Sequence, residues 1–306
     1  MLLRSATYAS VTVAACLALI KVWAWQATDS VAVLSSLADS FLDFLASLLT
    51  FWAVRYSLVP ADPEHRFGHG KAEGLAALLQ ATIIAGSGLY VAYTAVVRFV
   101  KPGPVETPEV GIAVIIASTL VTLALVAWQR YVSRETGSVA IAADAMHYKT
   151  DLFMNIGVVA ALLMVAYTGL TWIDPLVGLC VAIVLIAGAR HIAKRSLDIL
   201  LDHEIPDADR EHIREIAMRH EKVLGFHDLR TRHGGNNYII QFHLELAPRT
   251  SLVETHRILD VVESWVEKAY PDCEIIIHPD PLGYPEVRDE FGDDYEEPRE
   301  SSAISP

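Results

Sequence analysis

Two apolar stretches of this sequence each contain a pair of side chains that can bind a metal ion. Asp39 and Asp43 are four residues apart in the first stretch, and His147 and Asp151 are four residues apart in the second. Residues four apart lie on the same face of a helix, so each pair points in one direction. Three carboxylates and one imidazole match the ligand number and type of a tetrahedral Zn²⁺ site. The sequence therefore predicts a divalent-metal site where these two helices pack together.

The main alternative is that these side chains only hydrogen-bond helices to one another. A charged side chain at the centre of a bilayer costs about 2.5–3.5 kcal/mol or more, so such residues need a reason to be there. A bound divalent cation offsets the repulsion among three carboxylates. Two pairs of ligand-type residues in separate stretches favour the metal site. We expect the nearby Asp144 and Lys149 either to pair with other groups or to extend toward the membrane surface.

The elements that must position these residues are membrane-spanning helices. The chain has 306 residues, is 53 % hydrophobic and has a mean hydropathy of +0.34, an apolar excess that a soluble protein of this size does not need. A spanning helix takes about 20 mostly apolar residues, and six segments qualify. The predicted spans are residues 8–25, 33–54, 75–97, 110–131, 139–167 and 172–192.

Charge divides the chain into two parts. Residues 1–200 carry 13 basic and 13 acidic side chains, whereas residues 201–306 carry 11 and 24 and account for the net charge of −13. Basic residues are more frequent at the ends of the predicted spans that share a side with the two termini, which places both termini in the cytoplasm. The acidic part repels phosphate backbones, so we expect no nucleic-acid partner.

The second part resembles a small soluble domain followed by a tail. The order helix, strand, strand, helix, strand predicts a ferredoxin-like α/β domain. We therefore expect a transmembrane domain of residues 1–200, a cytoplasmic metal-binding domain of residues 201–284 and a disordered acidic tail of residues 285–306, which has too few apolar residues to form a core. The predicted elements of the domain are residues 207–219, 223–232, 238–246, 251–269 and 274–278.

Five short motifs resemble the cation diffusion facilitator family, in particular its bacterial zinc and ferrous-iron efflux branch. The resemblance covers nearly the whole chain, and it is highly specific because the motifs occur in the family's order. The motifs are A-D-S-F-L-D at 38–43, F-G-H-G-K-A-E at 67–73, D-A-M-H-Y-K-T-D at 144–151, F-H-D-L-R-T-R at 226–232 and I-I-I-H-P-D-P at 275–281.

The resemblance implies a homodimer in the bacterial inner membrane that works by alternating access and takes up protons in exchange for exported metal. The family's transport ligands fall on Asp39, Asp43, His147 and Asp151, a set similar to that of zinc and cadmium transporters. The imidazole agrees with this, because it favours zinc-like ions over hard ions.

The resemblance also implies two further zinc sites with a structural or regulatory role. The first is an interfacial loop site, although solvated loop histidines are the alternative reading. The second is a binuclear site in the cytoplasmic domain, where Pro279 departs from a ligand-bearing pattern. The implied ligands are Asp62, His65 and His69 for the loop, and His227, His243, His256, His278 and Asp280 for the domain.

Together these features predict a divalent-cation efflux transporter, most simply a Zn²⁺/H⁺ antiporter, with Cd²⁺ or Fe²⁺ as alternative cargo. A membrane-bound metal sensor without transport remains an alternative. An intramembrane metallohydrolase needs an open coordination position and a general base such as the Glu of HExxH, and the sequence has no HExxH. We therefore do not expect an enzyme.

Overall fold

The computed structural model describes the backbone of residues 2–28, 31–100, 111–168, 170, 172–234, 237–271 and 273–284. Contacts between Cα atoms divide the chain into two compact units, Met1–Leu200 and Leu201–Pro306. The predicted disordered tail, residues 285–306, lies outside the described residues.

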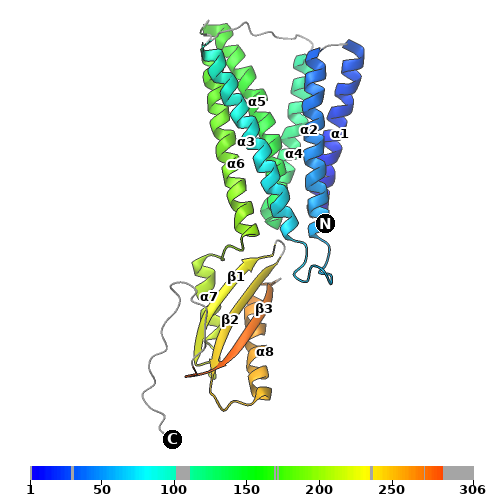
Figure 1. The fold of residues 1–306 in the computed structure, drawn as a ribbon. Coiled ribbons are helices and arrows are strands. Elements are labelled where there is room, and N and C mark those ends of the chain that lie inside the picture. Colours follow the sequence, from blue (N-terminus) through cyan, green and yellow to red (C-terminus); the bar gives the residue numbers. More distant parts are fainter. Residues whose placement is uncertain are drawn as a thin grey trace. The chain divides into compact units, whose positions relative to one another are not determined.

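The first unit is helical (Figure 1). Within the described residues it contains six long helices that match the six predicted spans, most of them extended by several residues at one or both ends. By length and composition, three segments of these helices qualify as membrane spans among the described residues: Leu2–Trp23, Lys71–Val100 and Pro175–Leu200. The helices are α1 (Leu2–Thr28), α2 (Val31–Ser57), α3 (Lys71–Val100), α4 (Gly111–Thr136), α5 (Val139–Thr168) and α6 (Ile173–Leu200).

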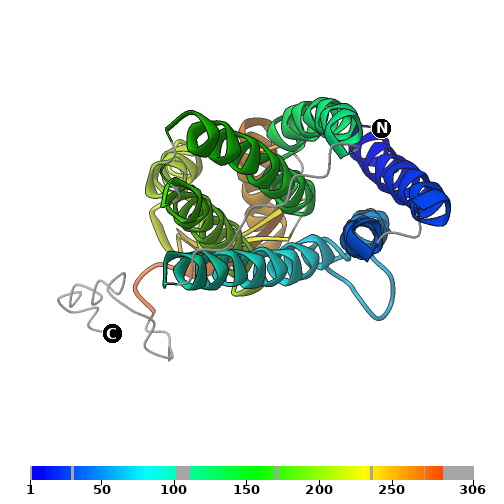
Figure 2. The same ribbon diagram turned by 90° about the horizontal axis from the view of Figure 1, so that it is seen from above.

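The six helices pack as two groups. Seen from above, α1, α2 and α4 lie on one side of the unit and α3, α5 and α6 on the other, with α4 beside α5 and α2 beside α3 (Figure 2). Small residues allow the close approach within the second group, where Ala77 and Ala81 of α3 share an apolar core with Ala143 of α5 and Ala189 of α6.

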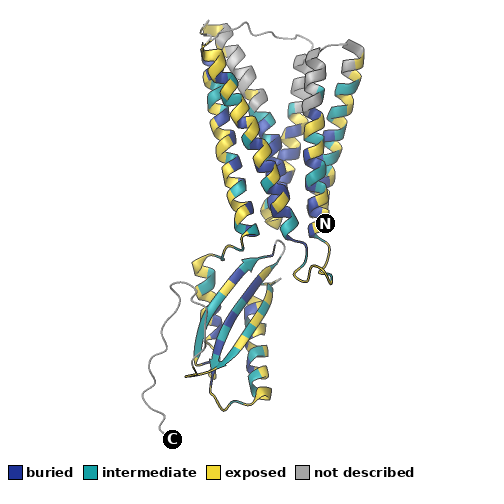
Figure 3. Ribbon diagram, in the orientation of Figure 1, coloured by how far each residue is buried: buried dark blue, intermediate teal, exposed yellow. Residues whose placement is uncertain are grey.

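Large apolar side chains cover much of the outside of this unit. Trp23 is 72 % exposed and Tyr90 is 70 % exposed, and exposed positions recur along the helices in Figure 3. A soluble protein rarely exposes continuous apolar surface of this extent. The outer surface therefore suits contact with lipid.

The second unit contains a three-stranded sheet in the order β1-β2-β3, with β1 antiparallel and β3 parallel to the central β2. The two helices of this unit cover one face of the sheet, where Ile213 of α7 and Val262 of α8 pack against Phe242 of β2. This arrangement confirms the predicted α/β domain, and β3 is longer than expected. The elements are α7 (Asp207–Ala217), β1 (Gly225–His233), β2 (Tyr238–Leu246), α8 (Leu252–Ala269) and β3 (Cys273–Pro281).

Candidate metal sites

Three of the four predicted ligands in the apolar helices lie close together. Asp43 of α2 and His147 and Asp151 of α5 place one ligand atom each within 4.8 Å of one another. The Nε2 atom of His147 lies 3.0 Å from Oδ1 of Asp43. We call these three residues the transmembrane cluster. Asp39 lies on α2 one turn before Asp43, and its side chain lies outside the described part of the structure.

The side chains of His147 and Asp43 in the transmembrane cluster are largely shielded from solvent. The His147 side chain is 11 % exposed and that of Asp43 is 25 % exposed. Close by, Lys21 of α1 donates a hydrogen bond of 2.6 Å to Ser40 of α2. Two apolar helices thus bring one imidazole and two carboxylates together.

The second cluster lies in the loop between α2 and α3. Asp62 Oδ1 lies 3.3 Å from Nδ1 of His65, and Asp62 Oδ2 lies 3.3 Å from Nε2 of His69. The backbone N–H of His65 also donates to Asp62, at 2.6 Å. This hydrogen bond is the main cause that holds the pKa of Asp62 below its ordinary value, so the carboxylate stays charged and ready for a cation. We call these residues the loop cluster.

The third cluster lies on the face of the sheet that α7 and α8 leave uncovered. In β2, buried Phe242 and Leu244 alternate with His243, so His243 points to the opposite face. Strand register places His227 beside His243, and His243 beside His278, in a row across the three strands. Register therefore explains why histidines distant in sequence meet.

Asp280 completes this third group, which we call the sheet cluster. Its Oδ2 atom lies 2.8 Å from Nδ1 of His243 and 3.2 Å from Nε2 of His227. Its Oδ1 atom lies 3.2 Å from Nε2 of His278. His227, His243 and Asp280 form a compact set of ligand atoms within 4.8 Å, with the more exposed His278 at its edge.

His256 does not join the sheet cluster within one chain. It lies on α8, which covers the opposite face of the sheet, and its side chain is 77 % exposed and 3.7 Å from Asp260. The sequence pattern placed His256 on a helix of the right domain. It carried no information on which face of the sheet that helix covers.

Two buried acidic residues of the helical unit hydrogen-bond to other helices, a role to which the sequence analysis gave no weight. Of the two expectations for Asp144, the structure shows pairing: it is 1 % exposed and accepts hydrogen bonds from polar side chains of other helices. Glu73 is also buried and is bonded to Ser57 and Ser138. Their signal in the sequence is the presence of acidic residues within or beside apolar runs.

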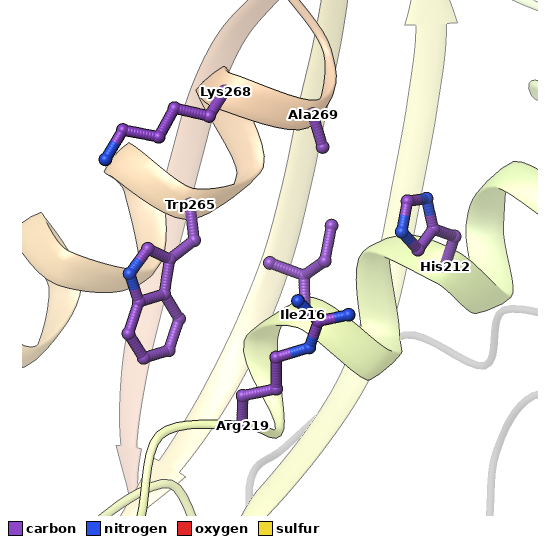
Figure 4. Close-up of a pocket in the computed structure, with 6 residues that line it drawn as sticks. All are labelled: His212, Ile216, Arg219, Trp265, Lys268 and Ala269. Atoms are coloured by element: carbon purple, nitrogen blue, oxygen red, sulfur yellow. The ribbon is translucent and has the colours of Figure 1, made fainter.

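A groove between α7 and α8 differs from the metal clusters in the residues that line it. Its volume is about 550 Å³, and His212, Arg219, Trp265 and Lys268 line it together with Ile216 and Ala269 (Figure 4). His212 is the one lining residue of metal-ligand type, and Arg219 and Lys268 are cations. The groove is therefore unsuited to bind a metal ion.

Models of two cation-efflux domains match most of the chain. A family model of the cation efflux transmembrane domain matches residues 7–201, and a model of the cytoplasmic domain of cation efflux proteins matches residues 205–282. The chain belongs to the cation diffusion facilitator family. It is thus a multi-pass membrane protein of a cation efflux family, which confirms the resemblance seen in the motifs.

Individual relatives of this family match almost end to end. The cation-efflux pump FieF of Shewanella oneidensis is 43 % identical over 279 residues, which is 91 % of this chain and 94 % of the relative. FieF of Salmonella choleraesuis is 41 % identical over 285 residues, which is 92 % of this chain and 93 % of the relative. A solved structure of the zinc form of CzrB, described as a candidate zinc transporter, is 32 % identical to this chain with a TM-score of 0.26. The match covers 28 % of this chain and 98 % of the CzrB chain.

Proposed function

We propose that this protein exports Zn²⁺ from the cytoplasm in exchange for protons. The observation that carries the proposal is the transmembrane cluster, in which Asp43, His147 and Asp151 converge from two apolar helices. Carboxylates alone suit hard ions such as Mg²⁺ and Mn²⁺, whereas an added imidazole favours zinc-like ions. The FieF relatives are named cation-efflux pumps, which supports the direction of transport.

In the proposed mechanism Asp39 is the fourth ligand of the transported ion. Zn²⁺ binds to deprotonated ligands, so its binding releases protons. Alternating access then exposes the site to the other side of the membrane, where protons compete for His147 and the carboxylates. A histidine is suited to this exchange because its ordinary pKa is near 6.5.

We assign the other two clusters to resident zinc with a structural or regulatory role. Both offer His and Asp ligands, which are ordinary zinc ligands in proteins. In the loop these are Asp62, His65 and His69, and on the sheet they are His227, His243, His278 and Asp280. We place the protein in the bacterial inner membrane as a homodimer with six spans per subunit, the acidic unit and both termini in the cytoplasm.

The decisive experiment is a metal panel in proteoliposomes with an imposed pH gradient. Wild-type protein should take up Zn²⁺, with Cd²⁺ and Fe²⁺ measured beside it, and uptake should collapse the gradient. Asp43→Ala, His147→Ala and Asp151→Ala should each abolish uptake while the protein stays folded and dimeric. Zinc binding without uptake by the wild type would instead identify a sensor, and near-normal uptake by any variant would remove that residue from the ligand set.

A further inference from the structure

A buried carboxylate lies one helical turn from the transmembrane cluster. Asp144, His147 and Asp151 follow one another at spacings of three and four residues on α5, so they share one face of that helix. On α2, Ser47 follows Asp43 by four residues in the same way. The Ser47 hydroxyl lies 3.5 Å from Oδ1 of Asp144. The two helices that hold the cluster are thus joined again one turn further along.

Side chains from four other helices point their donors at Asp144. Ser10 of α1 and Gln129 of α4 each donate to Oδ2 at 2.5 Å. Gln80 of α3 donates to Oδ1 at 3.3 Å, in addition to the longer contact from Ser47 of α2. All four of these groups can donate a hydrogen bond, and a carboxylate, which only accepts, requires such partners.

A chain of hydroxyl groups extends this arrangement. Tyr148 of α5 lies 2.7 Å from Ser47, and Ser47 lies 2.8 Å from Ser10. If Tyr148 donates to Ser47, the hydroxyl protons of both Ser47 and Ser10 are left for Asp144. A shared acceptor of this kind depends on all its partners at once, because any misaligned donor leaves a buried polar group unpaired.

Apolar packing alone does not fix how α2 and α3 meet. Gln80 of α3 also donates to Thr50 at 2.6 Å and to the carbonyl oxygen of Ala46 at 3.2 Å, both on α2. Gln80 therefore links α2 and α5 to α3, which in turn packs closely against α6. Asp144 is the point where the two groups of helices share one acceptor.

We propose that Asp144 is a positioning residue for transport. It sets the spacing of α2 and α5 at the transmembrane cluster by accepting hydrogen bonds from all four neighbouring helices. This role rests on the proposed zinc transport, and Asp144 itself need not touch the ion. Residues that orient metal ligands indirectly typically change metal affinity by about 10–100-fold when they are altered.

The test compares Asp144→Asn with Glu73→Gln in the full-length protein. Both variants turn a buried, hydrogen-bonded carboxylate into an amide, but Glu73 contacts Ser57 and Ser138 rather than the donors of Asp144. Zn²⁺ uptake should show a KM at least about tenfold higher for Asp144→Asn, and an unchanged KM for Glu73→Gln. Equal losses of thermal stability with a wild-type KM in both variants would overturn the proposal.

Two further variants cover the case in which Asp144→Asn does not fold. Ser10→Ala keeps the carboxylate and removes one donor, and it should raise KM by a smaller factor. Asp144→Asn combined with Gln129→Glu exchanges the amide and the carboxylate between α5 and α4, and it should restore folding and part of the Zn²⁺ affinity. An unchanged KM in Ser10→Ala and no recovery in the double variant would show that Asp144 acts only in folding.

Equilibrium Zn²⁺ binding separates this proposal from the transport function. Binding is measured on protein that carries His69→Ala and His243→Ala, so that the transmembrane cluster is the site observed. If wild-type vesicles take up no Zn²⁺, zinc transport is wrong, but a weaker Kd for Asp144→Asn than for Glu73→Gln still supports the positioning role. Equal Kd values for the two variants refute it.

Discussion

His147 is the residue that distinguishes the transmembrane cluster from an all-carboxylate site. Its Nε2 atom is 3.0 Å from Oδ1 of Asp43, so the imidazole and the carboxylate are close enough to bind the same ion. An imidazole nitrogen is a softer ligand than a carboxylate oxygen, and ligand softness is one of the ways in which proteins select metals. The choice of ion should therefore depend on this one side chain.

The substitution His147→Asp tests that dependence. It makes the site all-oxygen, so Mn²⁺ should compete better with Zn²⁺ for uptake than it does in the wild type. The measurement is the ratio of Zn²⁺ to Mn²⁺ uptake in proteoliposomes, with Thr150→Ser on the same helix as a control. An unchanged ratio would show that another feature selects the ion.

At the scale of elements, the sheet cluster depends on how the second unit holds its strands. Helix α8 packs Ile258, Val262 and Val266 into the core beneath β2. Ser251 caps this helix, because its hydroxyl accepts the backbone N–H of Glu254 at 3.3 Å. Lys222 then pairs with Glu254 at 2.5 Å, and this bond holds the pKa of Glu254 below its ordinary value.

Removal of the cap should destabilise the second unit without altering its metal ligands. Ser251→Ala typically costs about 1 kcal/mol of folding free energy at such a position. Urea unfolding of a fragment of residues 201–284 measures this loss, and Thr250→Ala, one residue outside the cap, should leave the midpoint almost unchanged. Equal midpoints for Ser251→Ala and the wild type would mean that the cap contributes nothing.

Zinc itself should stabilise the same fragment. A ligand that binds only the folded state adds RT ln(1 + [L]/Kd), about 2.7 kcal/mol at a hundredfold excess over Kd. We expect Zn²⁺ to raise the melting temperature of the wild-type fragment, and His243→Ala with His278→Ala to remove the rise. The matched control is His256→Ala. His256 lies on α8, on the opposite side of the sheet from the sheet cluster, so this variant should keep the zinc-induced rise in melting temperature. A full zinc shift in the double variant would remove the sheet cluster as a metal site.

At the scale of the whole molecule, three clusters of metal-ligand residues lie on separate elements of the part of the chain that the structure describes. One lies between α2 and α5, one in the loop before α3, and one on the sheet. They share no ligand, so the loss of one should leave the others able to bind. We therefore expect mutations to separate the proposed transport from the proposed regulation.

A series of single variants tests this independence in the full-length protein. Asp43→Ala, His69→Ala and His243→Ala should each lower the amount of zinc bound at equilibrium, and the losses should add. Only Asp43→Ala should abolish uptake in vesicles. Complete loss of uptake in His69→Ala or His243→Ala would show that the corresponding site belongs to the transport step. Equilibrium dialysis with metal analysis provides the first measurement.

Local patterns in the sequence determined much of this protein. Helix periodicity placed Asp43, His147 and Asp151 on defined helix faces, and strand alternation separated His243 from its buried neighbours. Apolar length predicted the helices, and the charge imbalance predicted the second unit. These properties follow from the repeat of each element, about 3.6 residues in a helix and two in a strand, and need no knowledge of neighbours.

Tertiary structure decided which of these faces meet. Strand register brought His227, His243 and His278 into one row, while the layer order of sheet and helices kept His256 away. The partners of Asp144 come from positions as distant as Ser10, and hydrogen bonds from four other helices converge on it. Such contacts depend on packing between segments far apart in the chain. The periodicity of one element cannot specify them, because it fixes a direction but not what lies there.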